Sequence, residues 1–239
     1  MTNIHEIHTV FNKVYERNQW GSGSGYGSSL SATKKYRRIV SNFLQKNGIG
    51  SVVELGCGDF QIMNQILSDD MSYVGYDVAS DVIVNNRIDF GTDNWKFDVL
   101  SDYSLLASAP LLICKDVLQH LPTEISQFII REIFPRYEHV LVTNCVGHRK
   151  ATKKNENVYP GSFTNLDVLS APFSVSGEVL LEWNAPLRSI LFPVISIRYI
   201  VRAPFVCAAY IKMILRAYLS GDYENHPRWR KHLVYVKNF

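Results

Sequence analysis

The stretch that decides the fold is Val52-Val-Glu-Leu-Gly-Cys-Gly-Asp-Phe60. It begins with an apolar run of the kind that forms a buried parallel strand, and Glu54 is the one acid in that run. Gly56 and Gly58 then allow a sharp turn and a close approach by a ligand. A helix predicted over 60–68 would offer free N–H groups at its start. The stretch therefore predicts the first crevice of a doubly wound α/β sheet.

Further apolar runs alternate with helical patterns along the chain. Strands are predicted at 51–55, 72–77, 95–99, 111–114, 139–144, about 177–183 and about 231–237. Helices are predicted at 3–17, from Ser31 to Gly48, at 80–88, near 102–108, and from Thr123 to Pro135. Short loops between alternating strands and helices indicate right-handed crossovers and a mainly parallel sheet. We expect a single α/β domain over 1–239, with a doubly wound, seven-stranded, mostly parallel sheet.

The crevice is predicted to take a cofactor that has no phosphate. The dinucleotide fingerprint G-x-G-x-x-G lacks its third glycine, because Gln61 stands there. Glu54 lies inside a buried strand, where an acid is costly unless it is paired. It should therefore meet a cation or a hydrogen-bond donor. S-adenosylmethionine (SAM) supplies an ammonium and a sulfonium group and carries no phosphate.

Four motifs in order carry a family resemblance. The segment Glu54-Leu-Gly-Cys-Gly-Asp59 resembles the first motif, E/D-x-G-x-G, of class I SAM-dependent methyltransferases. Tyr73-Val-Gly-Tyr-Asp77, Phe97-Asp98-Val99 and residues 111–122 resemble the second-, third- and fourth-strand motifs. The resemblance is best over 50–145. It implies a Rossmann-like methyltransferase fold, SAM as cofactor and S-adenosylhomocysteine (SAH) as product.

The resemblance also implies a set of cofactor contacts. Asp77 would accept hydrogen bonds from the ribose hydroxyls, and Asp98 would face the adenine amino group. The expected cofactor-binding residues are Trp20, Ser28, Glu54, Gly56, Cys57, Gly58, Asp59, Asp77, Val78, Asp98, Val99 and Lys115.

Residues 20–28 form a glycine- and serine-rich segment that begins with Trp20 and contains Tyr26. Such a composition is typical of a flexible linker, but a spacer would need no aromatic residue. The segment is similar to Trp-Gly-Ser…Ser-Gly-x-Gly-Ser stretches in a group of bacterial methyltransferases, many of them associated with glycan or secondary metabolism. That similarity implies that residues 1–48 supply N-terminal helices and a segment that covers the cofactor, with Trp20 at its amino-acid end.

Methyl transfer to an alcohol needs a base, and histidine is the commonest one. His120 follows the predicted fourth strand, and Asp116 lies four residues earlier, where it could orient the ring. His120 could instead only shape the pocket, which leaves His148 and Asp167 as second choices. Residues 113–116 replace the Asn/Asp-Pro-Pro-Tyr motif of many N-methylating relatives, which points away from amino acceptors. The spacing shows no cluster of Asp and His residues, so no metal site is predicted.

Composition bounds the partners and the compartment. The formal charge of +3 is too mild to predict nucleic-acid binding. The Lys and Arg clusters at 34–38, 149–154 and 228–231 are interpreted first as solvated surface charge. Four widely spaced cysteines, with no C-x-x-C pair, fit reduced thiols in a cytoplasmic protein. The start of the chain has no signal-peptide pattern.

Residues 185–226 are an apolar insert before the last predicted strand. Charges interrupt it before any run reaches the roughly 20 apolar residues of a membrane-spanning helix. Pro193 and Pro204 should divide it into short helices. We expect a helical cap over the acceptor pocket. A homodimer contact, or a peripheral membrane contact through 187–220, is the alternative.

The sequence therefore predicts a SAM-dependent O-methyltransferase that acts on a small-molecule or glycan acceptor. Three alternatives stay open. The first is a protein that binds SAM without catalysis. The second is a methyltransferase for a protein, lipid or RNA acceptor. The third is an oxidoreductase on the same fold, which the missing third glycine disfavours.

Overall fold

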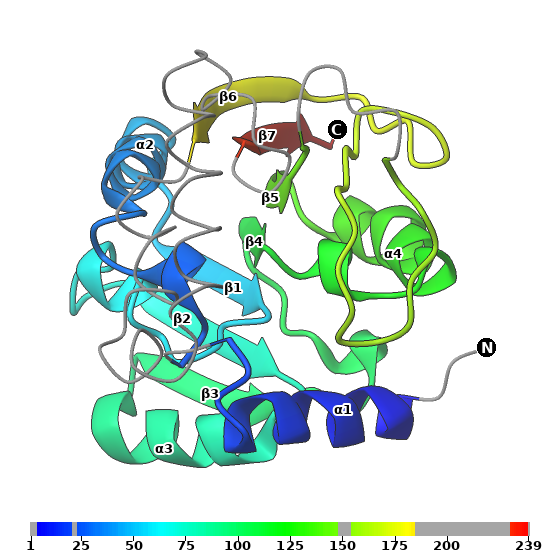
Figure 1. Ribbon diagram of the computed structural model, residues 1–239. Coiled ribbons are helices and arrows are strands. Elements are labelled where there is room, and N and C mark those ends of the chain that lie inside the picture. The colour runs from blue at the N-terminus through cyan, green and yellow to red at the C-terminus, as the bar shows by residue number, and fades with distance from the viewer. Residues whose placement is uncertain (1–3, 21–22, 148–153, 185–229, 239) are drawn as a thin grey trace, which may run out of the picture.

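The computed structural model of the chain describes residues 4–20, 23–147, 154–184 and 230–238. Seven strands form one sheet in the order β3-β2-β1-β4-β5-β7-β6 (Figure 1). The strands are β1 Ser51–Leu55, β2 Ser72–Asp77, β3 Trp95–Val99, β4 Leu111–Lys115, β5 His139–Cys145, β6 Glu178–Asn184 and β7 Arg230–Lys237. Strands β1 to β5 pair in parallel, whereas β7 runs antiparallel to both β5 and β6. The predicted seven-stranded, mostly parallel sheet is confirmed.

Helices cover both faces of the sheet. The α-helices are α1 Ile4–Glu16, α2 Lys34–Lys46, α3 Ser80–Phe90 and α4 Thr123–Phe128. Leu112 and Cys114 of β4 pack in the core cluster that contains the apolar side of α1 and the α4 region. Leu111 and Ile113, which alternate with them, pack in the cluster that contains α2 and Ile83 of α3. Because successive side chains of β4 are buried on opposite faces, the strand reads as a continuous apolar run.

The predicted helix over 60–68 is wrong in the structure. Only a short 3-10 turn, Met63–Gln65, follows the glycine turn. Phe60 has a positive φ of 57°, a left-handed backbone conformation that a helix cannot include. Its buried ring packs between those of Tyr73 and Phe97, with ring centres 4.9 and 4.8 Å away. The packing of Phe60 therefore replaces the helical start that the sequence suggested.

Two other helices are shorter or less regular than predicted. The helix from Thr123 changes to a π-helix at Ile129–Ile133 and to a 3-10 turn at Phe134–Arg136, where Pro135 ends the run. The helix expected near 102–108 is a 3-10 turn at Tyr103–Leu105. Both segments pack in the same core cluster as α1. The apolar spacing predicted their burial correctly, whereas it could not distinguish among the three helix types.

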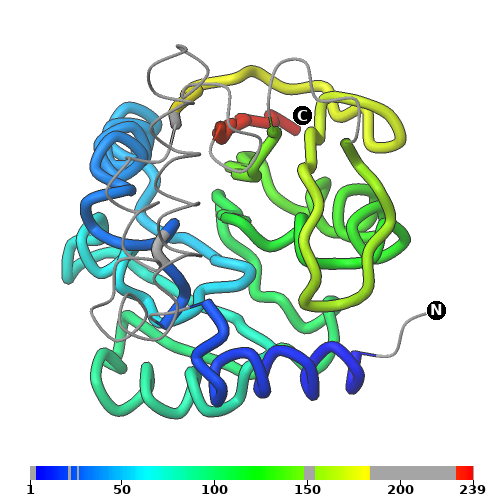
Figure 2. The backbone as a smooth tube through the Cα atoms, in the orientation of Figure 1, coloured from blue at the N-terminus to red at the C-terminus, as the bar shows by residue number. Residues whose placement is uncertain are grey.

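The carboxyl ends of the parallel strands meet at one edge of the sheet. Because β7 is antiparallel, its first residues reach that same edge, opposite Cys145 at the end of β5. The backbone trace shows the N-terminal segment (blue) and the loop that follows β5 (yellow-green) on the two sides of this edge (Figure 2). This edge therefore gathers residues from both ends of the chain.

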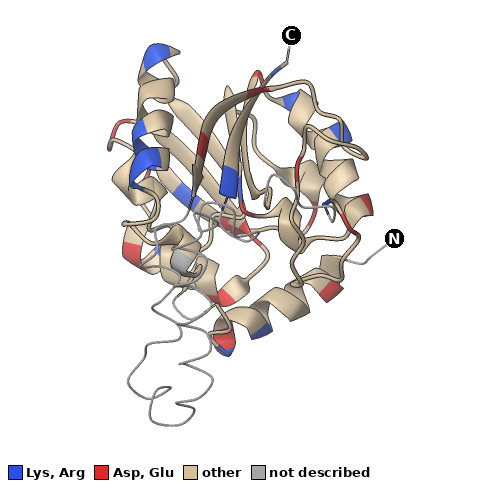
Figure 3. Ribbon diagram, turned by 45° about the horizontal axis from the view of Figure 1, so that its top comes forward, with Lys and Arg blue, Asp and Glu red and all other residues tan. Residues whose placement is uncertain are grey.

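The basic cluster at 34–38 lies along the outer side of α2 (Figure 3). Lys34, Lys35 and Arg38 are exposed, which agrees with solvated surface charge. No helix in the described ranges is long and apolar enough to cross a membrane. The predicted insert at 185–226 lies outside the described residues.

Candidate functional site

A cavity of about 280 Å³ opens at the carboxyl edge, beside the point between β1 and β4 where the strand order reverses. Ligands of doubly wound sheets bind at this point. The cavity is lined by Phe11, Tyr15, Trp20, Ser24, Gly25, Gly27, Ser28, Glu54, Gly56, Cys57, Gly58, Asp59, Gln61, Ile62, Met63, Asp77, Lys115, Asp116, Val117, Gln119, His120 and Lys231. Its volume is near the lower end of the ~300–1,000 Å³ range of small-molecule sites.

The glycine turn after β1 is held by β2. The N–H groups of Gly56 and Cys57 both donate to the carbonyl of Tyr76, at 2.7 and 3.0 Å. Gly56 has a φ of +77°, and a Cβ there would lie 2.2 Å from the side chain of Val117. A larger residue would therefore face both backbone strain and a collision. The motif requires glycine here because the turn packs against the loop after β4.

Two buried acids line the half of the cavity formed by β1 and β2. Glu54 accepts a 2.5 Å hydrogen bond from the Tyr73 hydroxyl. Burial raises the pKa of Glu54 to about 8, although Tyr73 and Lys115 act in the opposite direction. The carboxylate of Asp77 accepts from the N–H groups of Gly58 and Ala79, both at 2.9 Å. Burial raises its pKa despite these bonds. The donor expected for Glu54 is Tyr73.

The glycine- and serine-rich segment docks on the glycine turn through reciprocal hydrogen bonds. The N–H of Ser24 donates to Asp59 Oδ2 at 3.0 Å, and the N–H of Asp59 donates to Ser24 Oγ at 2.9 Å. The Tyr15 hydroxyl lies 3.1 Å from Ser24 Oγ. A Cβ on Gly58 would lie 2.1 Å from that same oxygen. The segment is therefore seated on the turn rather than suspended as a spacer.

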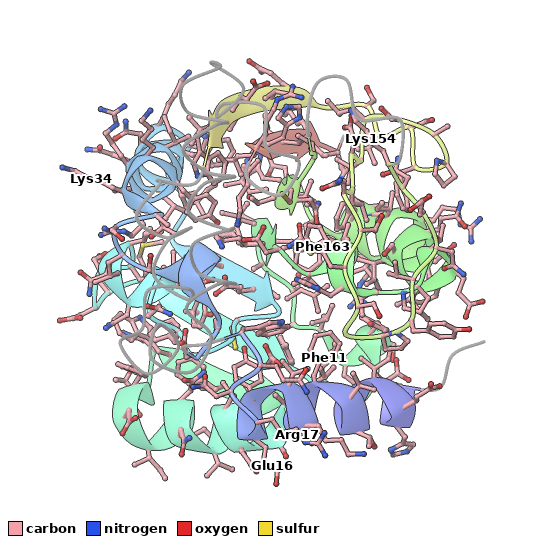
Figure 4. The ribbon with its side chains drawn as sticks, viewed as in Figure 1. Phe11, Glu16, Arg17, Lys34, Lys154 and Phe163 are labelled. Atoms are coloured by element: carbon pink, nitrogen blue, oxygen red, sulfur yellow. The ribbon has the colours of Figure 1, made fainter. Side chains whose placement is uncertain are left out.

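An aromatic wall forms the other side of the cavity. The Trp20 ring packs edge-on against Phe11 and Tyr15 and lies 5.4 Å from the ring of His120. Phe163 also approaches His120, with ring centres 5.8 Å apart. Figure 4 shows Phe11 on α1 and Phe163 on the loop that follows β5. His120 therefore contacts an aromatic residue of the N-terminal segment and one of the β5 loop.

The hydrogen bonds of His120 define its tautomer. Its Nδ1 lies 2.8 Å from the Ser162 carbonyl, which can only accept, so Nδ1 carries the proton. Its Nε2 lies 3.3 Å from the amide nitrogen of Gln119. The orientation of that amide is fixed because its oxygen accepts a 2.7 Å bond from the N–H of Cys145. Burial lowers the pKa of His120. The ring is therefore neutral, and its Nε2 accepts the hydrogen bond from the Gln119 amide.

Asp116 does not orient His120 as predicted. Its carboxylate instead forms ion pairs with Lys115 at 2.6 Å and with Lys231 at 2.5 Å. Burial opposes ionisation of Asp116, but these two ammonium groups outweigh it and hold the pKa of Asp116 well below its usual range. The Ser162 carbonyl and Gln119 fix the His120 ring instead. Asp116 affects His120 only as a nearby charge.

The structure brings most of the predicted site residues together. Those that line the cavity are Trp20, Ser28, Glu54, Gly56, Cys57, Gly58, Asp59, Asp77, Lys115, Asp116 and His120. Val78, Asp98 and Val99 do not line it. Asp98 forms a 2.6 Å ion pair with Arg87, and both side chains are about half exposed.

Asp167 and His148 were the two alternative candidates for the base. Asp167 accepts from the N–H of Leu169 and from the Ser170 hydroxyl and pairs with Lys154 at 3.6 Å, away from the cavity. It therefore organises its own loop. His148 lies outside the described residues.

For four residues that line the cavity, the sequence predicted no functional role. Tyr15 falls inside the helix predicted at 3–17, and Ser24 is one of several serines in the segment 20–28. Gln119 lies inside the fourth-strand motif, next to His120, but no role was predicted for it. Lys231 belongs to the basic cluster 228–231, which was interpreted as surface charge, yet it is buried. The one available signal was its place at the start of an antiparallel last strand, which brings it to the ligand edge.

Within the described part of the chain, no group of three or more His, Cys, Asp or Glu residues could hold a metal ion.

No protein-family model and no curated protein matches the sequence. Solved structures do match the fold. A candidate sarcosine dimethylglycine methyltransferase from Galdieria sulphuraria has a TM-score of 0.54 at 13% identity, covering 87% of this chain and 86% of that one. The N-terminal domain of EvdMO1, in the presence of SAH and D-fucose, has a TM-score of 0.52 at 11% identity, covering 89% and 84%.

A third structure has a TM-score of 0.50 at 11% identity and covers 87% of this chain and 84% of its own. It is magnesium protoporphyrin IX methyltransferase from Synechocystis PCC 6803 with bound SAH. At these identities the likeness defines the fold, which is that of SAM-dependent methyltransferases. The acceptor has to be argued from the site.

Proposed function

We propose that this protein is a SAM-dependent methyltransferase that methylates a hydroxyl group of a small-molecule or sugar acceptor. The observation that carries the proposal is one cavity that combines two features. Its first half presents the buried acids Glu54 and Asp77 at the ends of the first two strands. Its second half presents a neutral His120 whose unprotonated Nε2 accepts a 3.3 Å hydrogen bond from Gln119, a bond that the acceptor hydroxyl would have to replace. The first half fits the cofactor, and the second supplies a base.

The residues of the first half fit SAM. Asp77 has the acceptor oxygens that ribose hydroxyls require, and it lies at the end of β2, where the nucleoside half of such folds binds. The pKa of Glu54 is about 8. Glu54 can therefore lose its proton when the ammonium group of SAM binds, and form an ion pair with that group. The hydrogen-bonded pair of Asp59 and Ser24 closes the Glu54 end of the cavity. Cys57, Gly56, Gly58, Ser28, Trp20 and Lys115 complete the proposed contacts.

Asp98 is still the proposed adenine contact, and Val78 and Val99 are proposed cofactor contacts, although all three lie outside the cavity lining. Asp98 is held by Arg87 in an exposed ion pair, which typically contributes ~1 kcal/mol or less. A ligand could therefore displace Arg87 at little cost. We expect Asp98 to matter less for affinity than Asp77.

When bound, SAM would supply a methyl group on a sulfonium, which is a good leaving group. The residues of this chain then have three tasks. They hold the acceptor hydroxyl in line, exclude water, and accept the hydroxyl proton at His120 Nε2. The Ser162 carbonyl stabilises the resulting imidazolium, because it already accepts the Nδ1 proton. The Trp20 ring covers His120 on one side and limits the access of water.

Two alternatives make different predictions. A protein that binds SAM without catalysis would not need a lone pair at His120 Nε2. An RNA acceptor would need a basic face, and the cavity lining contains four acids and two lysines. A protein or lipid acceptor depends on the insert at 185–226. The cap, dimer and peripheral membrane contacts predicted for that insert stay predictions.

The test is calorimetric titration of the wild-type chain and two variants with SAM. Asp77→Ala should weaken binding by about 1–3 kcal/mol, or roughly five- to 150-fold, because a buried acceptor of two hydroxyls is lost. Asp98→Ala is the matched control at the end of the next strand and should weaken binding less. If the wild-type chain does not bind SAM, or if both variants bind as tightly as wild type, the proposal is wrong.

A further inference from the structure

Two buried lysines share one carboxylate at the rim of the cavity. Lys115 Nζ and Lys231 Nζ lie 2.6 and 2.5 Å from the same oxygen of Asp116. The side chains of Lys115, Lys231 and Asp116 are 3%, 9% and 15% exposed. Asp116 Oδ1, the other oxygen, is buried and has no hydrogen-bond partner. Two ammonium groups therefore share one carboxylate, and only one of the two oxygens of that carboxylate is paired.

The group lines the β4 and β7 side of the cavity, and Lys115 is also among the proposed cofactor contacts. Lys115 and Asp116 end β4, and Lys231 starts β7, so all three follow the strand-order reversal rather than precede it. Lys231 reaches this edge only because β7 is antiparallel. A Cβ on Gly27 would lie 3.1 Å from Lys231 Nζ, so the N-terminal segment packs against the ammonium group.

Within the described residues, Asp116 is the one carboxylate at ion-pair distance from the two lysines, and burial lowers the pKa of Lys115 although Asp116 opposes this. Glu54, which interacts electrostatically with Lys115, is largely protonated at neutral pH because burial raises its pKa to about 8. His120 is neutral, and Asp116 is the remaining ionised group that acts on both lysines. A buried cation in excess is costly unless a further anion pairs with it. A ligand that brought a negative charge here would remove that cost.

We infer that Lys231, supported by Lys115, binds an anionic group of the acceptor, either a carboxylate or a phosphate, and that Asp116 occupies part of this position in its absence. This inference rests on the proposed function, because the acceptor is defined by it. It restricts the acceptor to an acidic molecule that also carries a hydroxyl near His120. Lys231 is then a residue that determines acceptor specificity, and Asp116 sets how strongly it attracts an anion.

The carboxylate of the cofactor is a second possible source of the same chemistry, and ligand binding separates the two. Lys231→Met keeps the length of the side chain and removes its charge, and Lys231→Arg keeps the charge. Lys96→Met removes an exposed lysine from β3 as the control. Each variant is titrated with SAH and with 5′-methylthioadenosine, which lacks the amino-acid end. Each SAH complex is then titrated with inorganic phosphate and with acetate, against sodium chloride at equal ionic strength.

We expect Lys231→Met to bind SAH normally and to bind phosphate and acetate about tenfold or more weakly, because one charged hydrogen bond is lost. Lys231→Arg and Lys96→Met should stay within a few-fold of wild type. If SAH binding weakens while methylthioadenosine binding does not, Lys231 holds the cofactor and the inference is wrong. It is also wrong if wild type binds neither anion, or if Lys231→Met binds both as tightly as wild type.

A purely structural role for the three residues is tested by Asp116→Asn. Removing the internal anion should strengthen phosphate binding several-fold, because both ammonium groups become available to the ligand. A structural ion pair predicts unchanged or weaker binding, and that result would overturn the inference. This variant also keeps the test decisive if Lys231→Met fails to fold. If the wild-type chain does not bind SAH, the proposed function itself is wrong. This result distinguishes failure of the proposed function from failure of the inference about Lys231.

Discussion

Replacement of Glu54 by Gln is the most direct test of the electrostatics of this cavity. The change keeps the shape of the side chain and an oxygen that can accept the Tyr73 hydrogen bond, and it removes the titration. Glu54 lies in the middle of the sheet, between β2 and β4, and is buried. The expected effect is therefore a change in how stability depends on pH, with little change in the fold.

The sign follows from the proton balance. The carboxyl group titrates near its ordinary value of 4.5 in the unfolded chain and at about 8 in the folded one. Between these values only the unfolded chain loses the proton, so the free energy of unfolding falls by about 1.4 kcal/mol for each pH unit. The whole window corresponds to roughly 3–5 kcal/mol, where the lower figure allows for water that enters the cavity. Glu54→Gln should therefore match wild type below the window and be more stable above it.

Urea denaturation followed by circular dichroism, from about pH 5 to about pH 9, measures this difference. The control is Glu132→Gln, which changes an exposed carboxyl group outside the cavity. Subtracting the curves isolates Glu54 from other titrating groups, including Asp77. Parallel stability curves for wild type and Glu54→Gln would refute the argument, because they would mean that Glu54 is ionised in the folded chain at neutral pH.

Two further predictions concern the segment and the base. Ser24→Ala removes the oxygen that accepts from Asp59 and contacts Tyr15, so limited proteolysis between Gly23 and Gly27 should become faster without SAM; cleavage at the wild-type rate would mean that these bonds do not hold the segment. His120→Ala should keep SAM affinity and lose roughly 10²-fold in turnover. Because burial lowers the pKa of His120, wild-type kcat should reach its plateau before pH rises through the usual histidine range, and a plateau only above that range would exclude His120 as the base.

The centre of the sheet could be predicted because its strands are buried on both faces. Strands β1, β4 and β5 are buried along most or all of their length, and the glycine turn after β1 and the acid at the end of β2 mark their ends in the sequence. The residues at those ends, such as Gly58, Asp77 and Lys115, then fall at one edge by topology alone. The half of the site that the strand ends define was therefore accessible from the sequence.

The remaining half depends on contacts between distant segments. Ser24 meets Asp59, and Lys231 meets Asp116, across separations of 35 and 115 residues. No local pattern distinguishes Ser24 from its neighbouring serines, or Lys231 from a surface lysine. The helix predicted after the glycine turn failed for a related reason. The positive φ of Phe60 results from the aromatic cluster around it, which is formed by β2 and β3 rather than by its sequence neighbours.

The N-terminal segment joins the two halves of the cavity. Near its start Ser24 is bonded to Asp59 on the side of β1, and Gly27 packs against Lys231 on the side of β7. Any ligand that moves one end must also act on the other, because four residues cannot span much more than ~14 Å even when extended. Seating of the cofactor against Asp59 should therefore position the backbone beside Lys231, where the anion of the acceptor is proposed to bind. Binding of the two substrates should then be coupled through this segment, and Ser24→Ala should weaken that coupling without changing the charge of either site.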